Sequence, residues 1–158
     1  MISRLTECAA GHQRAAVVVV DVDRLGEVNE LHGMAAGDEV LRSVAAVLHR
    51  GYGGDATVGR IGGDRFAAVL PGRGVADAVE VCRRLCAAVD RTRLRTGAGV
   101  VHVGISAGVA EVVGDDVDAS LGNASLALTE AKRTGRNRAV PFTADLHRAA
   151  NRRTTLLR

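Results

Sequence analysis

The chain has 158 residues, which suits one compact domain around a single hydrophobic core. Hydrophobic residues make up 47% of the chain and aromatic residues only 2%, so the core must be built from Val, Leu, Ile and Ala. The formal net charge is +3, and the scarcity of aromatic side chains argues against a base-stacking surface for single-stranded nucleic acid. No apolar run reaches the roughly 18 residues that a membrane-spanning helix needs.

The cysteine pattern bears on the compartment. Cys8, Cys82 and Cys86 are an odd number and form no metal-ligand pattern, so they do not indicate a disulfide framework. Cys82 and Cys86 lie on the apolar face of a predicted helix, and we interpret them as small core residues. Because there is also no apolar leader segment, we expect a cytoplasmic protein.

The first third of the chain predicts one strand and two helices. Residues 15–22 form an apolar, β-branched run that ends in Asp21-Val22-Asp23, which indicates a strand buried on both faces. A short helix is predicted over 24–32 and is broken by Gly33. Glycines 51, 53 and 54 end the next helix. It is indicated by apolar residues at helical spacing, namely Val40, Leu41, Val44, Val47 and Leu48.

The middle of the chain predicts a β-hairpin and another helix. Two short β-type runs, 57–61 and 64–70, flank the pair Gly62-Gly63. A helix then follows from the spacing of Val75, Val79, Cys82, Cys86 and Val89. We expect residues 91–99 to be a polar loop.

The last part predicts a strand over 100–113, a helix with Asp118 as its N-cap, and a short edge strand over 138–142 that contains Pro141. The order β-α-α-β-β-α-β-α-β contains a central hairpin, which argues against a purely parallel doubly wound sheet. We therefore expect an α/β (α+β) fold, with a mixed central five-stranded sheet flanked by helices. The domain is expected over residues 1–142, followed by a basic, solvated C-terminal tail over 143–158.

Three segments carry groups that suit chemistry. Asp21 and Asp23 close a buried strand, where hard cations and phosphates bind, although an Asp in this place is often only a loop opener. Gly62-Gly63 lets the backbone adopt positive φ and lets a ligand approach, or is an ordinary hairpin turn. The cations of segment 132–138 either hold phosphates or complement a helix dipole.

Taken together and in order, these segments resemble the GGDEF family of diguanylate cyclases. Its first block is similar to Asp21-Val22-Asp23-Arg24-Leu25 with Val28-Asn29-Glu30 and Gly37-Asp38-Glu39-Val40-Leu41. Its signature hairpin resembles Arg60-Ile61-Gly62-Gly63-Asp64-Arg65-Phe66, and its later blocks resemble residues 103–110 and 131–138. The resemblance covers roughly residues 15–142 and implies a fold related to nucleotide cyclase and polymerase palm domains.

The resemblance also implies a chemistry. Two GTP-loaded domains face each other as a homodimer, and each ribose 3′-hydroxyl attacks the α-phosphate of the other GTP to form cyclic di-GMP. Mg²⁺ or Mn²⁺ would polarise the phosphates. The implied metal site is Asp21, the Val22 carbonyl and Asp64, with Asp64 also catalytic. The implied nucleotide site comprises Asn29 and Asp38, which would recognise guanine, and the phosphate-binding residues Gly62, Gly63, Lys132 and Arg136.

The sequence departs from the family pattern at the signature loop. Arg65 stands where the family has Glu, and at about 4 Å a unit-charge contact amounts to about 4 kcal/mol at an effective dielectric of about 20. A family Lys after the first Asp is replaced by Leu25-Gly26, so a phosphate contact is lost. The product-inhibition motif RxxD is absent, since Gly53 and Ala56 stand in its place.

Three hypotheses follow. The favoured one is a degenerate GGDEF domain in cyclic di-GMP-type signalling, which binds GTP or a related guanine nucleotide with weak or no cyclase activity. The second is an active diguanylate cyclase. The third is a nucleotide-free module that binds a protein partner or sensor domain.

Overall fold

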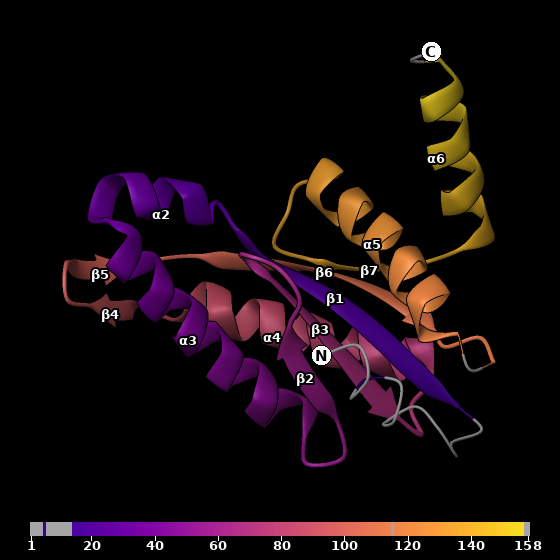
Figure 1. The fold of residues 1–158 in the computed structure, drawn as a ribbon, viewed down its shortest axis with the longest axis horizontal. Helices are drawn as coiled ribbons and strands as arrows, with labels where there is room; N and C mark the ends of the chain where they lie inside the picture. The colour runs from indigo at the N-terminus through magenta and orange to yellow at the C-terminus, as the bar shows by residue number, and fades with distance from the viewer. Residues whose placement is uncertain (1–4, 6–13, 115, 157–158) are drawn as a thin grey trace.

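The computed structural model describes residue 5 and residues 14–114 and 116–156. It contains a five-stranded sheet, a separate two-stranded sheet and helices on both faces of the larger sheet (Figure 1). The strands are β1 (Ala15–Asp23), β2 (Thr57–Arg60), β3 (Arg65–Pro71), β4 (Leu94–Thr96), β5 (Gly99–Val101), β6 (Gly104–Glu111) and β7 (Ala139–Pro141). The helices are α2 (Leu25–His32), α3 (Met34–Tyr52), α4 (Val75–Arg91), α5 (Val117–Arg133) and α6 (Ala144–Leu156).

The large sheet has the strand order β2-β3-β1-β6-β7. β1 is central and pairs antiparallel with both β3 and β6, whereas β7 pairs parallel with β6 at the edge. The expected mixed five-stranded sheet is therefore confirmed. The hairpin around Gly62-Gly63 and the edge position of the strand with Pro141 are confirmed as well.

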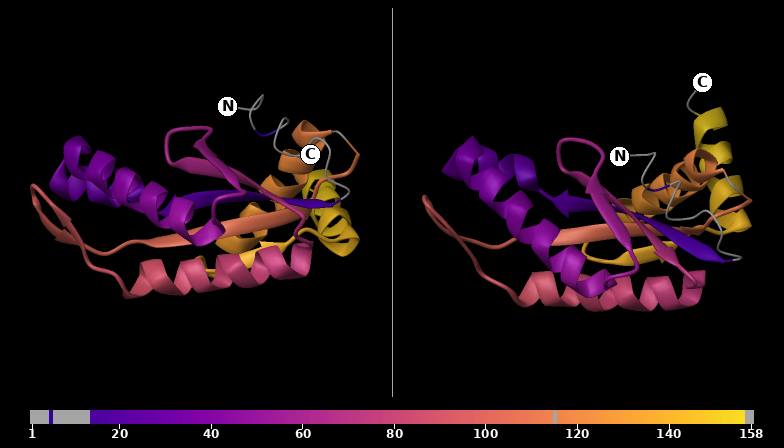
Figure 2. Two further views of the ribbon diagram at one scale, coloured as in Figure 1. Left: turned by 90° about the horizontal axis from the view of Figure 1, so that it is seen from below. Right: turned by 60° about the horizontal axis from the view of Figure 1, so that its bottom comes forward.

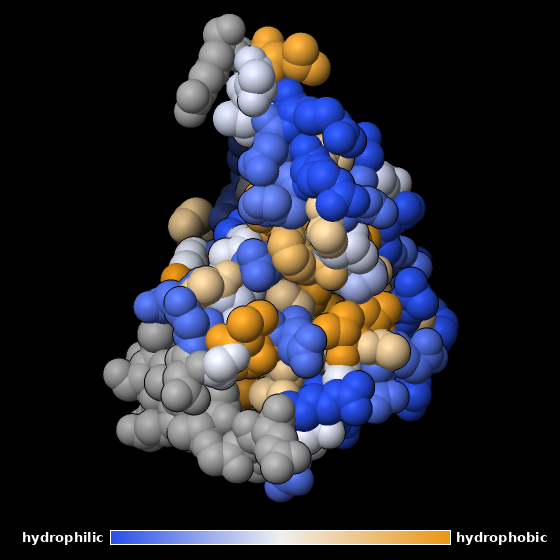
Figure 3. All heavy atoms as spheres, turned by 90° about the vertical axis from the view of Figure 1, so that its right-hand side faces the viewer, coloured by the Kyte–Doolittle hydropathy of each residue, from blue (hydrophilic) through white to orange (hydrophobic). Residues whose placement is uncertain are grey.

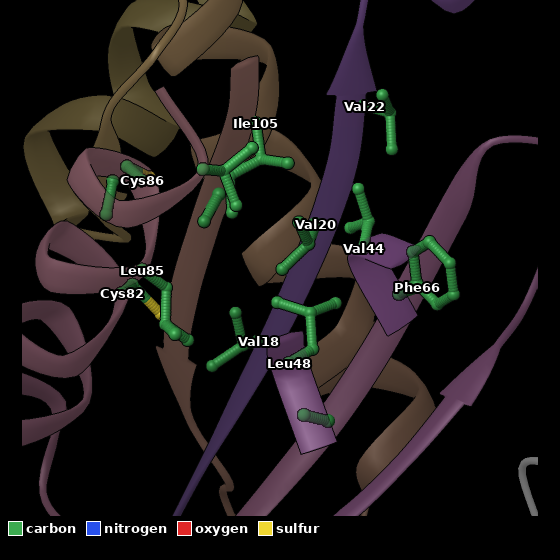
Figure 4. Close-up of a cluster of buried hydrophobic side chains, with 14 of the residues drawn as sticks. Val18, Val20, Val22, Val44, Leu48, Phe66, Cys82, Leu85, Cys86 and Ile105 are labelled. Atoms are coloured by element: carbon green, nitrogen blue, oxygen red, sulfur yellow. The ribbon is translucent and has the colours of Figure 1, made fainter. Parts of the chain in front are cut away.

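The larger core lies between the sheet and α2, α3 and α4. Alternate residues of β1 enter it, because side chains of a strand point to opposite faces in turn. Figure 4 shows Val18 and Val20 of β1 beside Leu48 of α3, with Cys82 and Leu85 of α4 on the other side. The core is aliphatic apart from Phe66, Tyr52 and the two cysteines Cys82 and Cys86, in keeping with the composition.

The opposite face of the sheet is covered by α5. Val17 and Val19 of β1 pack there against Leu121, Ala124 and Leu128. Figure 2 shows α5 across the sheet from α4. The helix lies very close, because a Cβ placed on Gly108 of β6 would stand 2.0 Å from the Ala124 carbonyl oxygen. The face that carries α5 also carries the candidate site, since Asp21 and Asp23 share the alternation of Val17 and Val19.

Three local expectations were wrong. Residues 91–99 are not simply a loop, because β4 and β5 pair as a hairpin, and the expected strand over 100–113 is interrupted between Val101 and Gly104. The hairpin is tied to α3 by the Glu39 carboxylate, which accepts from the Gly97 N–H at 3.2 Å. The helix α5 is capped by Asp116 rather than Asp118, since the Asp116 side chain accepts from the Ala119 N–H at 3.0 Å.

The expected basic tail contains the helix α6, which was not predicted from the sequence. The helix α6 has no buried residue, and its exposed side is hydrophilic in Figure 3. It touches the domain through the Arg153–Glu130 ion pair at 3.4 Å and through the edge-on contact of His147 with Phe142. None of the helices in the described parts of the chain is long and apolar enough to cross a membrane.

Candidate functional site

Asp21 is the centre of the candidate site. It lies near the end of β1 with only 2% of its surface exposed, on the face covered by α5. Its Oδ2 forms an ion pair with the ammonium group of Lys132, which stands in the last turn of α5. Its Oδ1 is buried and has no hydrogen-bond partner among the described residues. A buried carboxylate with one free oxygen is able to accept a further cation or donor.

Arg65 is the second cation at Asp21. The two residues are direct partners in the antiparallel β1–β3 ladder, so their side chains share one face of the sheet. The Arg65 guanidinium lies 3.6 Å from Oδ2 of Asp21 and is 39% exposed. The register thus makes the altered signature position a cross-strand ion pair.

The carboxyl group of Asp64 adjoins that of Asp21. Burial raises the pKa of Asp21, the neighbouring Lys132 ammonium lowers it, and the Asp64 carboxyl raises it again, with a net upward shift. The backbone also joins the end of β1 to the hairpin loop, because the Val22 N–H donates to the Asp64 carbonyl at 3.2 Å. The Val22 carbonyl points to the same edge of β1 as its N–H, toward the hairpin loop.

Asp23 shares the face of Asp21 but has different partners. The strand β1 continues through Asp23, so the condition for a shared direction is met. The Ser106 hydroxyl donates to Oδ1 at 2.7 Å, and the Asn137 N–H donates to Oδ2 at 3.1 Å. Both carboxylate oxygens are therefore used, and Asp23 joins β1 to β6 and to the loop before β7.

The glycines of the hairpin loop are not required by the backbone. Neither Gly62 nor Gly63 has a positive φ, contrary to expectation. A Cβ at Gly63 would meet no atom within 4 Å, and one at Gly62 would meet only the Arg65 Cβ at 3.7 Å. Arg60 holds the loop through its Nε, which donates to the Gly62 carbonyl at 3.0 Å, and through a second bond to the Gly63 carbonyl. The two glycines leave open space on an exposed loop.

Asn29 and Asp38 line one pocket with the signature loop. The pocket has a volume of about 320 Å³, and its walls include Gly26, Gly63 and Asp64. The Asn29 Oδ1 is buried without a hydrogen-bond partner in the described part of the chain. It faces Gly37 so closely that a Cβ there would stand 1.8 Å from it. The Asn29 amide and the exposed Asp38 carboxylate therefore lie beside the glycines, with the Asn29 Oδ1 turned toward Gly37.

Arg136 lies elsewhere. It is exposed in the loop between α5 and β7, with φ 62°, and lines a separate pocket of about 440 Å³ with Asp23, Arg24 and His102. The structure thus brings together Asp21, Asp64, Arg65 and Lys132, and next to them Asn29, Asp38 and Gly63. It does not bring Arg136 into the pocket of Asn29.

Sequence reasoning assigned no role to two residues that organise the site. Arg60 orders the loop carbonyls, and Ser106 orders Asp23. The only sequence cue to Arg60 was its place within the hairpin motif. Ser106 gave no cue, because its partner is distant in the chain and the contact depends on strand pairing.

The resemblance implies Mg²⁺, which requires oxygen ligands and a site with net negative charge. Oxygen donors are present, since Asp21 Oδ1 is free and the Asp64 carboxyl and Val22 carbonyl are near. The charge is not suitable, because Lys132 and Arg65 both pair with Oδ2 of Asp21, the carboxylate that the resemblance assigns to the metal. No group of three or more His, Cys, Asp or Glu side chains in the described residues is arranged to hold a metal ion. The residues present do not fit a pair of divalent ions.

Comparison with known proteins places this geometry in a family. The model of the family described as "Diguanylate cyclase, GGDEF domain" matches residues 1–138. The chain belongs to the GGDEF family. Diguanylate cyclase DgcZ of Escherichia coli (strain K12) is 33% identical over 126 residues, which cover 77% of this chain and 42% of that protein. The chain spans less than half the length of the first curated relatives that it matches.

Solved GGDEF domains have the same fold. The GGDEF domain of PA1120 (TpbB or YfiN) from Pseudomonas aeruginosa superimposes with a TM-score of 0.84 at 30% identity, covering 95% of this chain and 90% of that one. The GGDEF domain of DgcB from Caulobacter crescentus, solved in complex with c-di-GMP, gives a TM-score of 0.80 at 25% identity over 89% and 86% of the two chains. This GGDEF domain is thus of the diguanylate cyclase type.

Proposed function

We propose that this GGDEF domain binds GTP or a related guanine nucleotide and has little or no cyclase activity, acting in cyclic di-GMP-type signalling through binding. The observation that carries the proposal is the cross-strand ion pair of Arg65 with Asp21. It puts a cation against the carboxylate that the resemblance assigns to metal, and leaves the nucleotide pocket intact.

The pocket of Asn29 and Asp38 supports guanine as the ligand. An amide oxygen without a partner accepts a hydrogen bond, an amide NH₂ donates one, and a carboxylate accepts from two N–H groups. Guanine offers the matching set, with O6 as acceptor and N1–H and N2–H₂ as donors. The Asn29 Oδ1 is unpaired and turned toward Gly37, so the amide gains a hydrogen bond when it rotates toward a ligand in this pocket.

The signature loop supports phosphate binding beside the guanine. Gly62 and Gly63 are open on an exposed turn, and Lys132 stands next to Asp21 with 32% of its side chain exposed. Arg136 is part of the proposed phosphate site by resemblance, and it would have to reach across from its own pocket. Asp64 is the proposed catalytic carboxylate in any remaining activity, and Asp21, the Val22 carbonyl and Asp64 are the proposed metal ligands.

Isothermal titration calorimetry with GTP tests the binding half of the proposal. We expect a binding isotherm for the unmodified chain and a clear loss for Asn29→Ala. Asn151→Ala is the matched control, because Asn151 is exposed on α6, outside the pockets of Asn29 and Arg136. Absence of heat at millimolar GTP, together with absence of thermal stabilisation, would refute binding.

An active diguanylate cyclase is the second candidate. It is favoured by the adjacency of the Asp21 and Asp64 carboxyl groups, which the family assignment connects to catalysis. Activity would need two chains, because the resemblance implies that each domain carries one GTP. Incubation with GTP at high protein concentration, followed by chromatography for cyclic di-GMP, separates the two candidates.

We further propose that residues 1–142 form the functional unit and that residues 143–158 are an appended basic segment. The family model ends at residue 138, and α6 has no buried residue, which supports this division. The same proposal includes a homodimer, a partner or sensor domain, and a cytoplasmic location.

A further inference from the structure

Two cations are paired with Asp21 in the absence of a metal ion. Asp21 and Asp64 contribute two carboxylates, and Lys132 and Arg65 contribute two cations. Asp21 is 2% exposed, so its charge must be compensated by neighbours rather than by water. Asp21 therefore needs no divalent ion to compensate its own charge.

The strand register makes this compensation specific to Arg65. An acidic residue in its place would stand directly opposite Asp21, and like charges facing each other across a ladder are destabilising. Such a site would hold three carboxylates against the single Lys132 and would recruit cations from solution. With Arg65, the side chain at that position carries a positive charge instead of a negative one.

Arg65 also has access to the ligand. It follows Asp64, which lines the pocket with Gly63, and 39% of its side chain is exposed. A guanidinium presents a planar set of donors that matches phosphate oxygens in pairs. Lys132 adds an ammonium on the same carboxylate with 32% of its side chain exposed, so both cations present positive charge at the surface of the site while they remain paired with Asp21.

We propose that Arg65 and Lys132 supply the positive charge that binds the ligand's phosphates, so that this site takes a guanine nucleotide free of divalent metal and binds its Mg²⁺ complex less tightly. This inference rests on the proposed nucleotide binding. A nucleotide that carries Mg²⁺ has part of its negative charge neutralised, and its metal approaches two fixed cations. A nucleotide without metal keeps its full charge for Arg65 and Lys132.

Calorimetric titration with GTP in excess EDTA and in excess MgCl₂ tests the inference. The chains compared are the unmodified protein, Arg65→Glu, Arg65→Gln and the control Arg83→Glu, whose site is exposed on α4 on the other face of the sheet. We expect the unmodified protein and the control to bind more tightly in EDTA. Arg65→Glu should bind at least about tenfold more weakly in EDTA, the effect of losing one charge-assisted contact, and should bind better with Mg²⁺.

The outcomes separate the two claims. Two results would overturn the inference and leave the proposed function standing. One is GTP binding by the unmodified protein that requires Mg²⁺. The other is a ratio of GTP affinity in EDTA to GTP affinity in MgCl₂ that is the same for the unmodified protein and the Arg65 variants. No binding in either buffer overturns the proposed function itself. Arg65→Gln removes the cation without adding a charge, so it keeps the test valid where the Glu variant does not fold.

Mn²⁺ alone provides a second readout, without nucleotide. Electron paramagnetic resonance reports free Mn²⁺ during titration with protein. We expect no tight Mn²⁺ binding by the unmodified protein and a gain of binding in Arg65→Glu. Equal, tight binding by both chains would contradict the role given to Arg65.

Discussion

Arg65 and Asp21 face each other directly across the β3–β1 ladder, with the guanidinium 3.6 Å from the Asp21 Oδ2. Because the register fixes this pairing, a single residue decides whether the signature loop adds negative or positive charge to a buried carboxylate. In this chain it adds positive charge. Arg65 is not among the residues that line the neighbouring pocket of Asn29 and Asp38.

Reversing the charge at position 65 should destabilise the folded state in the absence of metal. We expect Arg65→Glu to lower the free energy of unfolding by about 1 kcal/mol in EDTA, since like charges then stand opposite each other. Arg65→Gln should lose less, because it adds no charge and Lys132 still pairs with Asp21. Urea denaturation measures both, and added Mg²⁺ should recover the loss only in the Glu variant. Equal stability of the two variants in EDTA would contradict the cross-strand account.

The signature glycines should matter for ligand and not for stability. Gly62→Ala and Gly63→Ala place a Cβ in open space at ordinary φ, so we expect changes in unfolding free energy within about 0.5 kcal/mol. The same methyl groups occupy the proposed approach of the phosphates, so GTP affinity should fall. Thermal unfolding and calorimetry on each variant check the two halves. A variant that unfolds much earlier would show that the loop backbone needs glycine.

Gly108 should behave in the opposite way. A Cβ there would stand 2.0 Å from the Ala124 carbonyl oxygen and 2.3 Å from the Leu128 backbone nitrogen, so Gly108→Ala must push α5 off the sheet. We expect a loss of about 3 kcal/mol or more. Gly122→Ala on α5 is the matched control, because its Cβ meets nothing within 4 Å and Ala favours the helix by about 0.5–1 kcal/mol. Equal denaturation midpoints for the two variants would refute the close contact.

The buried thiols should be inert and should make the fold sensitive to alkali. Burial raises the pKa of Cys82 to about 11 and that of Cys86 to about 12. In a Cys8→Ser background we expect no labelling by a thiol reagent until the chain unfolds. The raised pKa values keep both thiols protonated in the folded state while the unfolded state ionises near pH 9. Stability from this source is complete below about pH 9 and is lost as the pH rises toward 11. Labelling of native protein at neutral pH would contradict this.

Removal of α6 should leave the domain intact. The helix buries no residue and is held through Arg153–Glu130 and the His147–Phe142 contact. A chain ending at residue 142 should therefore unfold cooperatively, with a loss of about 1 kcal/mol or less, and should bind GTP with unchanged affinity. Circular dichroism melting and calorimetry provide the check. A molten or aggregated truncation would show that α6 belongs to the folding unit.

Much of the fold was predictable because its hydrophobic pattern is local. The run of valines in β1 indicated a central strand, and the Gly62-Gly63 pair between two β-type runs indicated the hairpin. The β4–β5 hairpin was missed because its strands are three residues long and it is held to α3 by Glu39. The helix α6 was missed because it carries no apolar stripe that enters the core.

The site was predictable only as a set of residues. The resemblance named Asn29, Asp38, Asp64 and Lys132, and the structure brings Lys132 to Asp21 and the other three to one pocket. The pairing of Arg65 with Asp21 depends on the register, which the sequence does not specify until the loop geometry is known. The separate pocket of Arg136 depends on the path of the chain after α5.

Incubation of the protein with GTP and Mg²⁺ or Mn²⁺ at high protein concentration, with chromatography of the nucleotides, tests the central claim most directly. The account predicts little or no cyclic di-GMP from the unmodified chain and some from Arg65→Glu. Efficient formation of cyclic di-GMP by the unmodified chain would contradict it.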